Sequence, residues 1–322
     1  MLRVPDDVLL NIFDFYRIDS YGPIGIDSFP IPWTWGSLAH VCRRWRQIIF
    51  ASVCRLDLQF LCTPKTHVRE LLDFLPPAMP IMVWSCYIPQ TQSLSTPSDD
   101  SEDGSQVITA IEQRDRVQWI HLENLPDSVL EKTVKMMQET FPTLKRLRLL
   151  AEYEIAPVLS EEFLGGSAPS LESLWLKGIP FPDIPKLLLT MNALVYLRLE
   201  KIPESGYFSP EAMVTALSTC TELGTLVIMF QPGEPHPDLT SQEITSIARV
   251  FLPELTFFSF TGNGRYSNNF IPRIESPLGL NDHIRHDTNT SANRDVFYEV
   301  YVSLFGISFR YHSQLNPVPV ED

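Results

Sequence analysis

The sequence has few cysteines, no long apolar run and no secretion signal. Its five cysteines, at positions 42, 54, 62, 86 and 220, are dispersed and never form a C-x-x-C pair. This spacing indicates neither a disulfide framework nor a zinc cluster, and it favours a reducing compartment. No stretch approaches the roughly 20 apolar residues of a membrane span, and the first residues lack the apolar core of a signal peptide. We therefore expect an intracellular protein, cytoplasmic or nuclear, that binds no membrane.

Positive charge is also scarce. The 322 residues include 25 Lys and Arg against 39 Asp and Glu, which gives a formal net charge of −14 and a pI near 4.9. Nucleic acids and anionic membranes are bound by cationic surfaces that displace counterions, so nucleic acid is not an expected partner. The hydrophobic content of 44% is ample for packed domains and excludes a wholly disordered chain.

Catalytic motifs are missing as well. There is no G-x-S-x-G, no Walker loop and no G-x-G-x-x-G. His283 and His286, with the aspartates beside them, could imitate a metal site, but two histidines three residues apart in an Asn-rich loop are more often chance. We expect no enzyme, no metal and no cofactor. A hydrolase that uses His283 or His286 is an alternative, and metal analysis of the purified chain would test it.

The chain does contain a repeated pattern. Stretches that begin at Val117, Leu171 and Leu194 have apolar residues at relative positions one, four, six and nine, and proline at ten. This L-x-x-L-x-L pattern is typical of leucine-rich repeats. Shorter versions of the pattern occupy Leu144–Leu149, Leu223–Ile228 and, with phenylalanines, Leu255–Phe260. Such repeats cannot bury their apolar face alone, so they stack and expose one long surface.

Helical segments are expected between the repeat strands. Asp127 can cap one helix, Ser209 with Pro210 can open another, and Thr240 with Glu243 forms a capping box for a third. The apolar stripes of the first two helices are Val129, Leu130, Val134, Met137 and Phe141, and Met213, Val214, Leu217 and Cys220.

The segments outside the regular repeats give weaker signals. Val53–Leu58 and Met79–Trp84 look like degenerate first repeats, and the polar, acidic residues 90–106 predict a mobile loop. Residues 262–294 are rich in Asn, Gly and Pro and are expected to form loop. The apolar run from Val296 to Phe309 predicts a strand or helix that covers the open end of the repeats.

The N-terminal residues predict two apolar helices. On a helical wheel, the apolar residues from Val8 to Tyr16 spread over roughly 220°, and only Asp7, Asn11 and Asp14 form a polar strip. A second helix is expected from Gly36 to Ala51, with its own apolar stripe. Fewer than fifty residues of this kind have more apolar surface than they can cover on themselves, so part of it should contact a partner or the repeats.

These helices carry a specific resemblance. The sequence Val4-Pro-Asp-Asp-Val-Leu-Leu-Asn-Ile-Phe13, followed by Val41-Cys-Arg-Arg-Trp-Arg-Gln-Ile-Ile49, resembles an F-box, whose pattern is L-P-[DE]-x-[VL]-L and then V-C-[RK]-x-W-[RK]-x-[IL]. It departs from the pattern at Val4, where leucine is usual, and in residues 16–35, which are longer than typical. The resemblance implies an α/β protein in which a three-helix F-box (1–52) precedes an irregular leucine-rich-repeat solenoid (53–261) with a parallel sheet on its concave face, and then a loop and capping segment (262–322).

An F-box followed by leucine-rich repeats is similar to the substrate receptors of Skp-cullin-F-box ubiquitin ligases, fungal ones in particular. The resemblance implies that the helices dock a Skp-type adaptor, and through it a cullin, while the repeats bind a protein substrate. The adaptor-binding residues it implies are Pro5, Leu9, Leu10, Ile12, Phe13, Val41, Cys42, Trp45 and Ile48. The alternative is a repeat scaffold in which the F-box-like helices serve only as a cap.

Substrate contacts are expected from the residues that flank the repeat leucines. Those leucines face the core, so their neighbours face the concave side by the period-two rule. The candidates are Trp119, His121, Arg146, Arg148, Trp175, Tyr196 and Arg198. Aromatic and arginine side chains dominate binding hot spots, and arginines on an acidic protein favour an acidic or phosphorylated peptide as ligand. The competing interpretation pairs these arginines with Glu172 and Glu200 and stacks the aromatics for sheet stability.

A second basic cluster lies near the N-terminus. Arg43, Arg44 and Arg46 are expected on a solvated helix face. Contact between these arginines and an acidic adaptor is implied only by the F-box resemblance.

Overall fold

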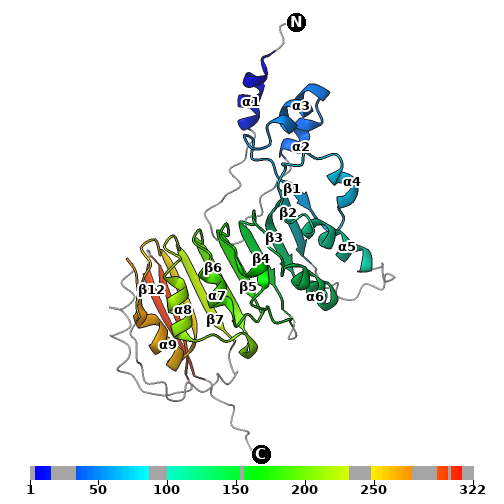
Figure 1. Cartoon of the computed structure of the whole chain (residues 1–322). Coiled ribbons are helices and arrows are strands. Elements are labelled where there is room, and N and C mark those ends of the chain that lie inside the picture. The colour runs from blue at the N-terminus through cyan, green and yellow to red at the C-terminus, as the bar shows by residue number, and fades with distance from the viewer. Residues whose placement is uncertain are drawn as a thin grey trace, which may run out of the picture. The chain divides into compact units, whose positions relative to one another are not determined.

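A computed structural model describes residues 4–15, 34–86, 100–152, 156–231, 248–277, 296–303 and 306–313 (Figure 1). The chain divides into two compact units, residues 1–85 with 89–121 (unit 1) and residues 86–88 with 122–322 (unit 2). Helices and parallel strands occur in both units, so the protein is α/β. Among the described residues, no helix has the length and apolar character needed to cross a membrane.

Unit 1 begins with the helices α1 (Asp6–Asp14), α2 (Thr34–Ala39) and α3 (Arg43–Ala51). The single helix expected from Gly36 to Ala51 is therefore wrong, because the chain leaves the helical conformation before Cys42. Cys42 has extended backbone angles and is the N-cap of α3, where its Sγ accepts a hydrogen bond from the Trp45 backbone N–H at 3.5 Å. Residues 16–33, where the F-box resemblance departs from its pattern, lie outside the described part.

The rest of unit 1 alternates short strands and helices, namely β1 (Phe60–Cys62), α4 (Val68–Leu72), β2 (Ile81–Cys86), α5 (Asp100–Ile111) and β3 (Val117–Glu123). The degenerate repeat expected at Val53–Leu58 is wrong, because Val53–Asp57 form turns and β1 begins only at Phe60. Met79–Trp84 does lead into β2, which pairs in parallel with β1.

The acidic segment expected to be loop up to residue 106 is wrong from residue 100 onward, because α5 begins there. Its C-terminal half buries Val107, Ala110 and Ile111, and this apolar side gives the segment a reason to fold. Residues 90–99 of the expected loop lie outside the described part.

Unit 2 confirms the expected alignment of repeats. The strands β4 (Arg146–Leu150), β5 (Ser173–Lys177), β6 (Tyr196–Ile202), β7 (Thr225–Phe230) and β9 (Phe257–Asn263) pair in parallel in that order. The third position of each of the five repeats lies at one register position across the sheet, and these residues are Arg146, Ser173, Tyr196, Thr225 and Phe257. The sixth repeat, from Val117, lies in β3, most of which belongs to unit 1.

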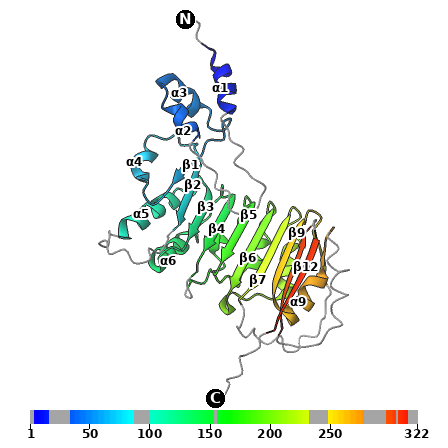
Figure 2. The same cartoon turned by 180° about the vertical axis from the view of Figure 1, so that it is seen from behind.

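Helices cover one face of these strands. The connections contain α6 (Asp127–Met136), η1 (Phe163–Gly166), α7 (Ile184–Leu188), η2 (Glu204–Gly206) and α8 (Pro210–Leu217). Figure 1 shows α7 and α8 in front of the strands, and Figure 2 shows β4 to β7 from the other side, with neither helix in front. The repeat leucines, such as Leu174 and Leu197, are fully buried, as the period-two rule predicts.

The predicted helix starts have different outcomes. Ser209 is the N-cap of α8, and its Oγ accepts a hydrogen bond from the Ala212 N–H at 3.1 Å, which confirms the prediction. The prediction for Asp127 is wrong, because Pro126 occupies the N-cap and Asp127 is already the first helical residue. The capping box of Thr240 and Glu243 lies outside the described residues.

The C-terminal part of unit 2 is more regular than its composition suggests. Residues 264–275, expected as loop, form α9 (Gly264–Phe270), η3 (Ile271–Arg273) and β10 (Ile274–Glu275), and β10 pairs with β8 (Val250–Phe251). The loop prediction failed because Tyr266 and Phe270 are buried among aromatic rings, which anchors the polar segment. The run from Val296 forms β11 (Val296–Ser303) and β12 (Gly306–Ser313), which extend the sheet beyond β9 in antiparallel pairing.

Candidate protein-binding surfaces

Helix α1 divides its apolar residues between the core and the surface. Leu9, Leu10 and Phe13 are buried, and the Phe13 ring packs edge-on against Trp45 of α3 with ring centroids 4.9 Å apart. Val8, Ile12 and Phe15 are exposed by 44%, 41% and 89%. These three residues follow i, i+4, i+7 spacing, so they form one stripe, which we call the α1 apolar face.

Polar contacts fix the orientation of α1. Arg44 of α3 donates from Nε to Asp6 Oδ1 at 3.1 Å and from Nη2 to the carbonyl oxygen of Val4 at 2.6 Å. Near the other end of the helix, Arg55 donates to Asn11 Oδ1 at 2.7 Å. Surface pairs of this kind contribute little stability each, but they act on both ends of one short helix. The α1 apolar face is thereby held away from α3.

Two arginines of the basic cluster of α3 contact neighbouring helices. Arg44 joins α3 to the start of α1, and Arg46 donates from Nε to the Ala39 carbonyl oxygen of α2 at 3.1 Å. Arg43 is exposed. The expectation of a solvated face is confirmed for Arg43 and Arg46, which are exposed, whereas Arg44 is half-buried because its side chain turns back onto α1.

The residues expected to bind an adaptor fall into two groups. Pro5, Ile12, Val41 and Cys42 are exposed, Trp45 is half-buried, and Leu9, Leu10, Phe13 and Ile48 are buried. Val41 is 58% exposed at the junction of α2 and α3. The sequence-based set omitted Val8 and Phe15, although their helical spacing from Ile12 was a usable signal.

On the helix-free face of unit 2, Trp175 of β5 lies between two arginines. The guanidinium carbon of Arg148 (β4) is 3.5 Å from the Trp175 ring centroid, and that of Arg198 (β6) is 4.4 Å from it. The three residues occupy one register position on adjacent strands. Each cation–π contact at such a site contributes on the order of 0.5–1 kcal/mol. We refer to Arg146, Arg148, Trp175, Arg198 and Glu200 as the arginine face.

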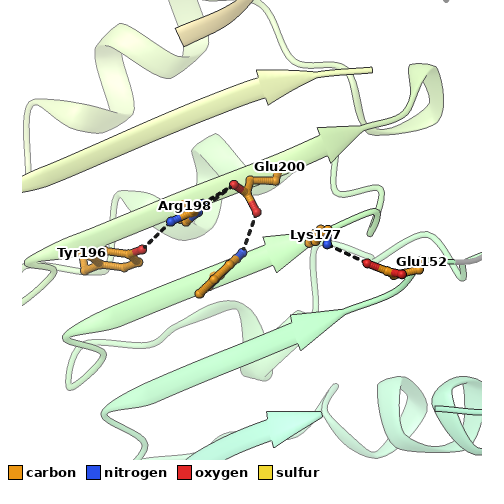
Figure 3. A network of polar contacts seen from close by, with 6 residues as sticks. Glu152, Lys177, Tyr196, Arg198 and Glu200 are labelled. Carbon is orange, nitrogen blue, oxygen red and sulfur yellow. Dashed lines mark hydrogen bonds and ion pairs between the residues drawn. The ribbon is translucent and has the colours of Figure 1, made fainter. Parts of the chain in front are cut away.

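Glu200 holds part of this cluster together (Figure 3). It accepts hydrogen bonds from the Arg198 Nε at 2.8 Å and from the Trp175 Nε1 at 3.2 Å. Arg198 also donates from Nη1 to the Tyr196 hydroxyl at 3.3 Å. Burial acts to lower the pKa of Arg198, but the hydrogen bonds to Glu200 and Tyr196 outweigh it and raise the pKa above its usual value. Arg198 is therefore committed to contacts within the protein.

Two lysines beside the arginine face have carboxylate partners. Lys177 Nζ lies 2.8 Å from Glu152 Oε1 (Figure 3), and the hydrogen bond from Lys177 lowers the pKa of Glu152. Lys145 Nζ lies 3.0 Å from Glu172 Oε1. The competing interpretation from the sequence is thus confirmed for the pairing of an arginine with Glu200, whereas Glu172 pairs with a lysine.

Other predicted substrate residues are less accessible. In unit 1, Trp119 is half-buried, and His121 is only 1% exposed, with its ring 6.4 Å from that of Trp84. In unit 2, Tyr196 is 6% exposed. Prediction from the sequence named Glu200 only as a partner of the arginines in the competing interpretation, although its position two residues after Arg198 placed it on the same face.

The alternative site at His283 and His286 lies outside the described residues. Within the part of the chain that the structure describes, no three His, Cys, Asp or Glu side chains are grouped closely enough to hold a metal ion.

Comparison with known proteins adds no assignment. No model of a known protein family matches the sequence, and no curated protein matches it. Function therefore has to be inferred from the surfaces themselves.

Proposed function

We propose that this chain is a substrate-recognition subunit of a cullin-type ubiquitin ligase. Residues 1–52 act as an F-box that docks a Skp-type adaptor and, through it, a cullin. The repeats stack as an irregular leucine-rich-repeat solenoid and bind a protein substrate, while other subunits transfer ubiquitin. The α1 apolar face is the observation that carries the proposal, because it is an apolar stripe in the F-box-like region that remains outside the core.

The chemistry of this face suits a protein partner. Val8, Ile12 and Phe15 form a stripe on a helix whose opposite side is already packed on α3. An exposed apolar stripe on an otherwise polar surface is typical of helix-in-groove recognition. Full burial of each such side chain contributes about 1.5–3 kcal/mol, and the part still exposed on α1 is available to a partner. Val41, next to α3, adds exposed apolar surface to the same helical module.

The parallel strands supply the other half of the proposal. Repeats that share one register present a ladder of side chains on the helix-free face, and this ladder includes Trp175 and Arg148. Tryptophan and arginine are enriched in binding hot spots because they combine large contact area with directed hydrogen bonds. A rigid sheet that presents them has little ordering entropy left to lose on binding.

Co-purification with a Skp-type adaptor tests the proposal. Val8→Glu with Ile12→Glu places two carboxylates on the α1 apolar face, where burial of an unpaired charge is costly. Gln47→Glu, on the exposed side of α3, is the matched control. We expect the double variant to lose at least about tenfold in adaptor affinity, equivalent to 1.4 kcal/mol, and the control to bind like the native chain. Leu9 is unsuitable for this test because its side chain belongs to the core.

The result also decides between the two views of the helical module. If the double variant retains its melting temperature and still binds the adaptor normally, then the α1 apolar face is not the docking surface. If the native chain binds no Skp-type adaptor, the F-box assignment is wrong, and a repeat scaffold capped by F-box-like helices is the better description.

A further inference from the structure

The exposed apolar residues at the N-terminus are symmetrically spaced. Val4, just before α1, is 44% exposed and continues the α1 apolar face of Val8, Ile12 and Phe15. Steps of four, four and three residues keep all four on one side of a helical segment. The three buried residues of α1 lie about 100–200° away from Val8 on the helical wheel, so the contacts with the core come from the opposite side.

This stripe is complementary to a second copy of itself. When two α1 helices lie antiparallel, a two-fold axis at the level of residue 10 places Val8 against Ile12 of the other copy, and Ile12 against its Val8. The same axis brings Phe15, which is 89% exposed, to the level of Pro5 and Val4 of the other copy. Each exposed apolar residue of the segment thereby gains an apolar neighbour.

The charges match in the same register. Asp7 is exposed, and nowhere in the described ranges does a cation form an ion pair with it. Arg55 lies against the same flank of α1 as Asp7, where its Nη2 donates to Asn11 Oδ1 at 2.7 Å and lies 3.6 Å from Asp14 Oδ2. A two-fold axis sets the same flank of both helices side by side. Asp7 then lies at the level of position 13 of the other copy, next to its Arg55.

The size of this surface limits the strength of the contact. Standard protein interfaces bury about 800 Å² on each partner, and one helix of nine residues provides less. We therefore expect a dissociation constant on the order of 10–100 μM.

We infer that the free chain forms a weak two-fold dimer in which two α1 helices pack antiparallel through their apolar faces, with Asp7 of each copy against Arg55 of the other. The second copy covers the face that the proposed function assigns to the adaptor. Self-association and adaptor docking therefore exclude each other on this face.

Sedimentation velocity of the full chain, without adaptor, tests the dimer between about 5 and 200 μM, a range that brackets the expected dissociation constant. We expect the native chain to shift from monomer to dimer, and Val8→Glu with Ile12→Glu to remain monomeric. Asp7→Arg opposes Arg55 of the other copy and should weaken the dimer about tenfold at low salt and less at high salt. Glu70→Arg is the matched control, because Glu70 is also an exposed carboxylate in the first turn of a helix, α4.

A mixing experiment tests the register itself. Asp7→Arg and Arg55→Glu each place like charges together in their own dimer, but a mixed dimer of the two variants restores both opposite-charge pairs. We expect the mixture to form dimers at concentrations where each variant alone is monomeric. Melting temperatures within about 2 °C of the native value, less than the shift for 1 kcal/mol, will show that both variants are folded.

Four results would overturn the inference. These are a native chain that stays monomeric at 200 μM, a dimer that survives Val8→Glu with Ile12→Glu, an equal loss in Glu70→Arg, and a mixture that associates no better than its components. No adaptor is present in these measurements, so a failure to dimerise and a failure to bind the Skp-type adaptor are separate outcomes.

Discussion

Gly178 offers a direct test of how the repeat strands end. It follows β5 with φ +67°, a left-handed conformation that L-residues other than glycine rarely adopt. Its N–H donates to the Glu200 carbonyl oxygen at 2.8 Å, while the Ala151 N–H donates to the Lys177 carbonyl oxygen at 2.8 Å. A Cβ on Gly178 would overlap the carbonyl oxygen of Ala151, which is backbone and cannot rotate away.

The cost of Gly178→Ala has two separable parts. The left-handed conformation costs alanine about 1 kcal/mol, and the overlap with the Ala151 backbone adds about 2 kcal/mol. Gly166→Ala is the matched control, because Gly166 has φ +69° but its added Cβ would lie 3.4 Å from the Glu161 carbonyl oxygen, an ordinary contact. At about 2–4 °C per kcal/mol, the expected fall in melting temperature is about 6–12 °C for Gly178→Ala and about 2–4 °C for Gly166→Ala.

Thermal unfolding followed by circular dichroism measures both variants. The far-ultraviolet spectra of the two folded variants should match that of the native chain, so that the melting temperatures refer to the same structure. Equal shifts in the two variants would refute the reasoning, because the backbone overlap at Ala151 would then have no effect. A Gly178→Ala protein as stable as the native chain would also refute the tight junction of β4 and β5.

Two further predictions concern buried groups. Burial raises the pKa of the Cys62 thiol to about 12, against a smaller lowering by a nearby arginine, so native protein at pH 8 should be alkylated at the exposed Cys42 and Cys54 and not at Cys62. Mass spectrometry checks this, with guanidinium-unfolded protein as the control, and early labelling of Cys62 would contradict it. Glu200→Gln removes the carboxylate that holds the half-buried Arg198, and it should lower the free energy of unfolding by about 1–3 kcal/mol. Urea denaturation measures this loss, and an unchanged midpoint would show that the contact contributes nothing.

The repeat strands were predictable because one periodicity decides them. Leucines at alternate positions, such as Leu174 and Leu176, can only be buried together on one face of a strand, and a shift by one residue would expose both. The same constraint acts on each repeat, so the register across β4, β5 and β6 follows from the sequence pattern. The same pattern also determines which side chains lie on the opposite face of the sheet.

The segments that were mispredicted depend on a few anchoring residues. Composition marks residues 262–294 as loop, yet Tyr266 and Phe270, four residues apart, give α9 a buried side. The break before α3 depends on Cys42, whose thiol is a weak acceptor and not among the favoured N-cap groups. The average polarity of a segment does not reveal such residues. Burial of one aromatic ring can stabilise a helix even when several of its neighbours are polar and face the solvent.

A strand or helix pattern predicts the face on which an arginine lies but not the partner that it contacts. Periodicity places Arg148 and Arg198 on one face and Arg44 on a helix surface, but it does not choose their partners. A long side chain reaches several neighbours, and the choice depends on which acceptor lies within hydrogen-bond distance after folding. Glu200, on the same strand as Arg198, accepts a hydrogen bond from that guanidinium. Asp6 accepts one from Arg44, although the two residues are 38 positions apart in the sequence. Arg148 lies over the Trp175 ring of the adjacent strand, a contact that the strand pattern does not specify.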